Sequence, residues 1–343
     1  MPEMTKHEFG TFSWLDLSTT DIEGAKDFYG TMFGWEFEPQ VVEGELVYTI
    51  CTLNGLQVCG LGGTMGEDDP PCWNVYTCVE DVDATSNRAV ELGGKIEAGP
   101  MDIFDSGRMS FISDPQGAML GLWQPREHLG VQVMFEPGTF MWAEIMTWDA
   151  EGTNAFYQGL HGWDTVADHS NPNYTLYVPG GDTSRTVYLA GQLAMDENFD
   201  KSIPTYWGIY LQVSDTAETL RRCIELGGEQ AVPATEIAQG TFAGPRISPC
   251  GTPPIPPPPA EEPEPRPPRL PSSCHQVCLC VQPGKFRHLD PTVVRHEVPA
   301  AQGLTALNGQ RSDWPSGRGV SRTLCKSLGA TRATSMILEV LDT

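Results

Sequence analysis

The chain has 343 residues and a formal net charge of −24, with 21 Lys and Arg against 45 Asp and Glu. So acidic a protein repels phosphate groups, which argues against binding to nucleic acid or to an anionic membrane. The chain has no run of about 18 apolar residues, so no transmembrane helix is predicted. The first residues, MPEMTKHEFG, lack the apolar segment of a signal peptide, so we expect a cytoplasmic protein.

A segment near the start of the chain recurs 128 residues later. Residues 8–35 read EFGTFSWLDLSTTDIEGAKDFYGTMFGW and residues 136–163 read EPGTFMWAEIMTWDAEGTNAFYQGLHGW, with thirteen of twenty-eight positions identical. The period is far longer than the roughly 20–50 residues of a solenoid repeat and has the size of a small domain. The sequence therefore predicts two tandem copies of one domain.

Strand-like alternation, acidic helix starts and glycine helix stops recur within each copy. In the first copy they predict, in chain order, a strand over 12–18, a helix from the Thr20–Glu23 capping box to Gly34, strands over 46–53 and 56–61, a strand over 73–79, a helix starting near Asp83 and ending at Leu92-Gly93-Gly94, and strands over 109–113 and 119–123.

The second copy follows the same plan but is incomplete. It predicts a strand over 140–146, a helix from Asp149 to Gly162, strands over 174–178 and 186–190, a strand over 207–213 and a helix from Asp215 to Gly228. After Gly251 the chain enters a run of prolines, which cannot supply the donors of a central strand. We therefore predict that this copy lacks its last strand.

The remainder of the chain has a different composition. Residues 1–243 hold 10 Lys and Arg against 37 Asp and Glu, whereas 244–343 hold 11 against 8 and also 17 of the 29 prolines. The pattern predicts that 252–343 is disordered. Two origins stay open: an out-of-frame or read-through sequence, and a genuine Pro-rich tail that docks in an aromatic groove.

Several motifs together resemble one protein family. They are Trp14-x-Asp-Leu-x-x-x-Asp21, Phe28-Tyr29, Phe33-Gly34-Trp35, Asp81-Val-Asp83, Leu92-Gly93-Gly94 and Asp114-Pro-Gln-Gly117. The chain resembles the glyoxalase/bleomycin-resistance/dioxygenase superfamily, also called vicinal oxygen chelate proteins. The resemblance implies an α+β fold of two tandem glyoxalase-like domains made of paired βαβββ units. Together with the composition, it predicts a domain over 8–125, a linker over 126–135, an incomplete second domain over 136–251 and the tail over 252–343.

The resemblance also implies where metal ligands would lie, namely on strand positions that face a cup. Those positions hold Trp14, Asn74 and Gly121 in the first copy, and Trp142 and Gly208 in the second. Divalent ions need His, Asp or Glu at several such places. We therefore expect no metal and no cofactor.

Aromatic side chains and one carboxylate are expected in each cup instead. Because side chains alternate faces along a strand, the first cup is predicted to hold Phe12, Trp14, Asp16, Asn74, Tyr76 and Trp123, and the second Trp142, Glu144 and Tyr210. Aromatic faces beside a carboxylate favour a flat or cationic small molecule. The alternative is that these aromatic residues only fill a core.

The sequence thus predicts a metal-independent small-molecule-binding protein, with no nucleic-acid or membrane partner. Two alternatives stay open. One is a glyoxalase- or dioxygenase-like lyase or oxidoreductase in which Asp16 acts as general base; the other is a non-catalytic remnant with an unstable second domain. The ten cysteines form no regular framework, which favours buried, reduced thiols. Neither the ligand nor the oligomeric state follows from the sequence.

Overall fold

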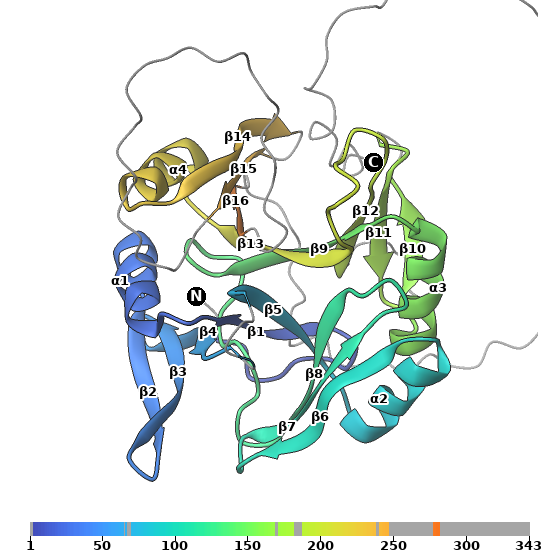
Figure 1. Cartoon of the computed structure of the whole chain (residues 1–343), viewed down its shortest axis with the longest axis horizontal. Coiled ribbons are helices and arrows are strands. Elements are labelled where there is room, and N and C mark those ends of the chain that lie inside the picture. Colours follow the sequence, from blue (N-terminus) through green and yellow to red (C-terminus); the bar gives the residue numbers. More distant parts are fainter. Residues whose placement is uncertain are drawn as a thin grey trace, which may run out of the picture.

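The computed structural model describes residues 3–64, 66, 70–168, 171–181, 187–237, 240–246 and 277–281 (Figure 1). The described residues form two eight-stranded sheets, one for each copy of the repeat. The fold is α+β, as the sequence predicts, and each sheet joins two βαβββ units.

The first sheet has the strand order β2-β3-β4-β1-β5-β8-β7-β6. Strand β1 lies at its centre, parallel to β4 and antiparallel to β5. The elements of this copy are β1 (Phe12–Ser18), α1 (Ile22–Phe33), β2 (Glu36–Val42), β3 (Glu45–Leu53), β4 (Leu56–Gly62), β5 (Cys72–Cys78), α2 (Val82–Glu91), β6 (Lys95–Ile103), β7 (Gly107–Ser113) and β8 (Met119–Pro125).

The second sheet repeats this order as β10-β11-β12-β9-β13-β16-β15-β14. Its elements are β9 (Phe140–Thr147), α3 (Ala150–His161), β10 (Asp164–Ala167), β11 (Tyr174–Val178), β12 (Ala190–Ala194), β13 (Tyr206–Gln212), α4 (Thr216–Glu225), β14 (Glu229–Ile237), β15 (Gly240–Arg246) and β16 (Val277–Val281). The strand predicted over 186–190 corresponds to β12, which lies further along the chain than predicted and begins at Ala190.

An aspartate side chain caps each described helix by accepting the N–H of the residue three positions later. The caps are Asp21, Asp81, Asp149 and Asp215. This corrects two predicted starts: Asp21 caps α1 in place of Thr20, and Asp81 caps α2 in place of Asp83. Gly34 and Gly162 end α1 and α3 in the left-handed conformation, with φ of 73° and 71°.

Strand β16 occupies the place that β8 has in the first sheet. It pairs parallel with β13 and antiparallel with β15. This corrects the prediction that the second copy lacks its last strand, because the apolar run Val-Cys-Leu-Cys-Val within the predicted tail supplies it. The proline run and the rest of 252–343 lie outside the described residues.

The helices of one copy pack against the helices of the other. Helix α1 packs against α4, and α2 packs against α3, so that each pair combines one helix from each copy (Figure 1). Buried side chains from both copies form one core cluster. None of the helices in the described ranges has the length and apolar character of a membrane span. Four cysteines of the described ranges, Cys51, Cys59, Cys78 and Cys223, are buried and have free thiols.

Candidate functional site

The first polar cluster lies on the face of the first sheet that points away from the helices. We define it as Trp14, Asp16, Tyr48, Asn74 and Tyr76. Strands β1 and β5 pair so that Asp16 lies opposite Asn74 and Trp14 lies opposite Tyr76. The intervening residues Leu15 and Val75 are buried on the helix side, and the period of two along each strand separates the two sets.

The carboxyl group of Asp16 accepts three hydrogen bonds. Tyr48 and Tyr76 donate their hydroxyls to Oδ2, each at 2.9 Å, and Asn74 donates from Nδ2 to Oδ1 at 2.9 Å. Trp14 Nε1 donates to the Tyr48 hydroxyl at 3.0 Å. Burial raises the pKa of Asp16, and the bonds from Asn74, Tyr76 and Tyr48 oppose that rise.

Two glycines make room for the tyrosine rings of this cluster. A Cβ on Gly60 would overlap the hydroxyl end of Tyr48, and a Cβ on Gly121 would overlap the ring of Tyr76. Gly121 stands where the family resemblance places a metal ligand. The ring of Tyr76 fills the space that a ligand side chain at this position would need.

A residue of the 126–135 segment covers the first polar cluster. The His128 ring lies edge-on against Trp14, with centroids 4.4 Å apart, and also contacts Trp123 at 5.6 Å. Trp123 Nε1 donates to the His128 carbonyl at 2.9 Å. Burial lowers the pKa of His128 to about 4, so its ring is neutral at neutral pH.

The second polar cluster lies at the equivalent place on the second sheet. We define it as Trp142, Glu144, Tyr174 and Tyr210, with Gly208 beside them. Tyr210 donates its hydroxyl to Glu144 Oε1 at 3.0 Å, and Trp142 Nε1 donates to the Tyr174 hydroxyl at 3.3 Å. Burial raises the pKa of Glu144, and hydrogen bonding by Tyr174 and Tyr210 opposes the rise.

Phe12 does not join the first polar cluster, although alternation along the strand predicts that it would. A register shift between Phe12 and Trp14 places Phe12 opposite Thr77, which belongs to the helix side. The Phe12 ring packs against Phe140, Trp163 and Trp207 of the other copy. Its place is therefore the core between the copies. Trp123 lies next to His128, at the margin of the cluster.

Tyr48, Tyr174 and His128 were not predicted from the sequence as site residues. Each tyrosine lies in a strand whose pairing was not known from sequence, and each ring lies over a glycine of the neighbouring strand, Gly60 or Gly191. A Tyr and a Gly at matched distances from the repeated strand are a signal that could have found both. His128 lies in a loop, where the sequence carries no periodicity.

The residues at the expected metal positions do not fit a metal ion. Trp14 offers only an indole N–H donor, Gly121 has no side chain, and the Asn74 amide donates to Asp16 and to Ser18. No group of three or more His, Cys, Asp or Glu in the described ranges is arranged to hold a metal.

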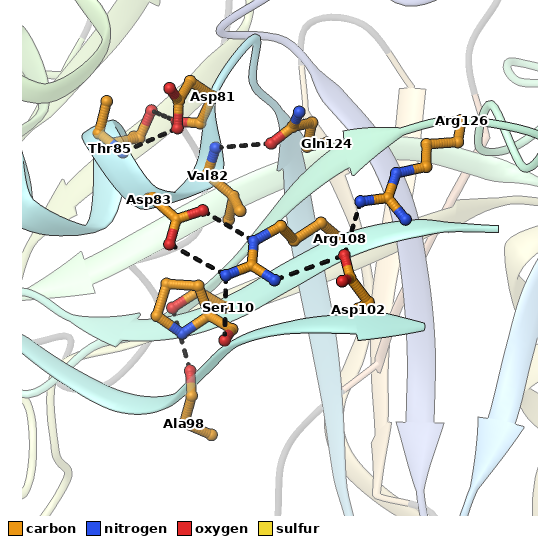
Figure 2. Close-up of polar contacts among 12 residues, drawn as sticks. Asp81, Val82, Asp83, Thr85, Ala98, Asp102, Arg108, Ser110, Gln124 and Arg126 are labelled. Carbon is orange, nitrogen blue, oxygen red and sulfur yellow. Dashed lines mark hydrogen bonds and ion pairs between the residues drawn. The ribbon is translucent and has the colours of Figure 1, made fainter. Parts of the chain in front are cut away.

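An exposed ion-pair network lies outside both clusters (Figure 2). The Arg108 guanidinium pairs with Asp83 at 2.7 Å and with Asp102 at 3.4 Å, and Arg126 pairs with Asp102 at 2.6 Å. These contacts tie the start of α2 to the β6–β7 hairpin and to the segment after β8. The Arg108 hydrogen bond lowers the pKa of Asp83. Because its charges are paired with one another and exposed to water, we assign the network to the surface of the fold and not to a binding site.

Comparison with known proteins identifies the family. A family model of the Glyoxalase/Bleomycin resistance protein/Dioxygenase superfamily matches residues 11–122. A Mycobacterium tuberculosis protein provisionally named glyoxylase CFP32 is 36% identical over 251 residues, which are 71% of this chain and 93% of that protein. The chain therefore belongs to the glyoxalase/bleomycin-resistance/dioxygenase superfamily.

Two further proteins are similar to this chain, one in sequence and one in fold. The anthracycline biosynthesis protein DnrV of Streptomyces peucetius is 29% identical over 243 residues, covering 66% of this chain and 85% of that protein. The Mn(II)-bound glyoxalase from Novosphingobium aromaticivorans has a TM-score of 0.51 at 11% identity, covering 80% of this chain and 82% of that one. At this identity the likeness to the solved structure concerns the fold alone.

Proposed function

We propose that this protein binds a small aromatic or cationic molecule without the help of a metal ion. The observation that supports this most is one arrangement found in both sheets: a buried carboxyl, Asp16 or Glu144, held by tyrosine hydroxyls beside a tryptophan. A carboxyl on a face that only filled a core would be costly to bury. Kept beside aromatic walls, it recognises a cation or a hydrogen-bond donor.

The charge of the chain and one relative agree with this class of ligand. Residues 1–243 carry 37 acidic against 10 basic side chains, so a cation is attracted to this part of the protein at long range. DnrV is named for anthracycline biosynthesis, and anthracyclines combine a planar aromatic skeleton with an amino sugar. We extend that chemistry, a flat ring system with an amine, to the present chain.

The enzymatic alternative has less support from the geometry. Both oxygens of Asp16 already accept hydrogen bonds from Asn74, Tyr48 and Tyr76, so a general base at Asp16 would first have to lose a partner. The remnant alternative has little support either, because the second sheet has the same strand order as the first. The cytoplasmic location stays a prediction.

The test is a binding measurement on the full chain. We expect 9-aminoacridine and daunorubicin, two planar aromatic cations, to quench tryptophan fluorescence and to give a saturable calorimetric signal. We expect the affinity to survive dialysis against a chelator, with metal content checked by mass spectrometry. Absence of binding for both probes, or binding that returns only when a divalent metal is added, would refute the proposal.

A further inference from the structure

The carboxyl groups of the two polar clusters differ in the hydrogen bonds that their oxygens accept. In the first, each oxygen of Asp16 accepts at least one hydrogen bond, from Asn74 on one side and from Tyr48 and Tyr76 on the other. In the second, Glu144 Oε1 accepts from Tyr210. The Tyr174 hydroxyl also lies beside this carboxyl and opposes the rise in its pKa, but Glu144 Oε2 is buried and accepts no hydrogen bond of good geometry among the described residues.

The difference has a simple origin in the sequence. Asn74, which donates to Asp16, is replaced at the equivalent place of the second copy by Gly208, which lies opposite Glu144 as Asn74 lies opposite Asp16. Gly208 has no side chain to donate. A Cβ on Gly208 would meet its nearest atoms, the Glu144 carbonyl oxygen and the Tyr206 ring, at 3.7 Å, so a side chain could start there without overlap.

The aromatic walls also differ in exposure. Trp14 and Tyr76 are 5% and 4% exposed, and His128 packs edge-on against Trp14. Their counterparts Trp142 and Tyr210 are only partly buried. Trp142 and Tyr210 thus leave aromatic surface open beside Glu144, whereas Trp14 and Tyr76 are covered by the protein. The remaining pair differs in the opposite sense, since Tyr48 is partly buried and Tyr174 is buried.

A buried carboxyl oxygen without a donor is costly, and a ligand that brings a donor removes that cost. Glu144 is 4% exposed, so its interaction with a bound charge is screened little by water. Trp142 and Tyr210 add ring faces that attract a cation.

From these contacts, we propose that the ligand binds at the second polar cluster and presents a protonated N–H group to Glu144 Oε2, in the place where Asn74 stands in the first cluster. This inference rests on the proposed function and narrows it to one of the two clusters and to aromatic amines that carry both a positive charge and an N–H donor. The first cluster, in which Asn74 plays the part of the ligand's donor, is structural.

The test compares two acridines on matched variants of the full chain. 9-Aminoacridine is a cation with N–H donors at neutral pH, whereas acridine has nearly the same ring shape and is mainly neutral. We expect Glu144→Gln to weaken 9-aminoacridine binding by roughly ten- to hundredfold, the range for a hydrogen bond to a charged group. We expect the weaker binding of acridine to change little.

Gly208→Asn provides a second variant that adds a group to the site. Its amide should donate to Glu144 as Asn74 donates to Asp16, and 9-aminoacridine should then bind less tightly although the carboxyl is kept. Trp142→Phe should weaken binding. Trp148→Phe, the same change at a partly buried tryptophan outside both clusters, should leave it unchanged, and Trp14→Phe reports on the first cluster. Thermal unfolding of each variant verifies that the chain is folded.

The outcomes separate this inference from the function on which it rests. If 9-aminoacridine binds the natural chain and the affinity is unchanged in both Glu144→Gln and Gly208→Asn, the second cluster is not the site, and this inference is wrong while the proposed function stands. If Trp14→Phe alone weakens binding, the site is at the first cluster, and this inference is again wrong. If neither acridine nor daunorubicin binds the natural chain, the proposed function itself fails.

Discussion

Trp35 Nε1 donates a hydrogen bond to the carbonyl oxygen of Gly138, 2.8 Å away, and so joins the end of α1 to the start of the second copy. The equivalent residues of the repeat make the same contact: Trp163 Nε1 donates to the carbonyl oxygen of Gly10 at 2.8 Å and so joins the end of α3 to the start of the first copy. Both indoles are buried, at 4% and 1% exposure. The repeated motif therefore encodes the contact between the copies as well as each copy's own fold.

We predict that Trp35→Phe destabilises the whole protein. The change keeps an aromatic ring but leaves the Gly138 carbonyl without its donor, at a cost of about 1–3 kcal/mol. Urea unfolding followed by circular dichroism measures the loss. Because the contact spans the copies, we expect a single transition shifted as a unit, and Trp163→Phe should behave alike; a second transition appearing in either variant would contradict this.

A second prediction concerns the glycine beneath Tyr76. Gly121→Ala would place a methyl group within the Tyr76 ring, so the ring must move and weaken its bond to Asp16. Overpacking of this kind costs about 1–3 kcal/mol. Gly208→Ala is the matched control, because its Cβ would meet its nearest atoms at 3.7 Å. Equal losses of thermal stability in both variants would contradict the expected role of Gly121.

How much the sequence predicted depends on whether a signal was local. The repeat and the alternation of Trp14 with Asp16 predicted the central strands and the faces of most cluster residues. Phe12 was misplaced because an irregular register between neighbouring strands leaves no local mark. Strand β16 was missed because the residues that precede it are rich in proline and reveal nothing of its pairing with β13. Tyr48 and Tyr174 required knowledge of which strands are neighbours.

Acid should destabilise the protein through His161. Burial lowers the pKa of His161 to about 3 from an ordinary value of 6.5, so the unfolded chain binds the proton first and stability falls as the pH drops below about 6.5. The slope for one proton is about 1.4 kcal/mol per pH unit. His161 also shares a hydrogen bond with Thr77 of the other copy at 3.2 Å.

His161→Phe tests this contribution, because Phe33 occupies the equivalent position in the first copy. Stability measured by urea unfolding between mildly acidic and neutral pH should depend less steeply on pH in the variant, although loss of the Thr77 bond lowers it somewhat at neutral pH. An unchanged slope would mean that His161 is not protonated on unfolding in this range.

Neutralising the two cluster carboxyls should have opposite effects on stability. Burial raises the pKa of both Asp16 and Glu144, so ionisation of either group costs stability as the pH rises above its ordinary value. Asp16→Asn replaces one of the two acceptor oxygens with an N–H₂ group, so the donors at that side, Tyr48 and Tyr76 or Asn74, lose their acceptor; we expect a loss of about 1–3 kcal/mol.

Glu144→Gln removes a buried charge that has few donors, so we expect it to be at least as stable as the natural chain at neutral pH. That advantage should shrink in acid, because Glu144 then takes up its own proton in the folded state. Thermal melts of both variants over a pH series measure the contrast. If Glu144→Gln proved as damaging as Asp16→Asn at neutral pH, Glu144 would have to be a fully satisfied structural carboxylate, and a cation could not find a free oxygen there.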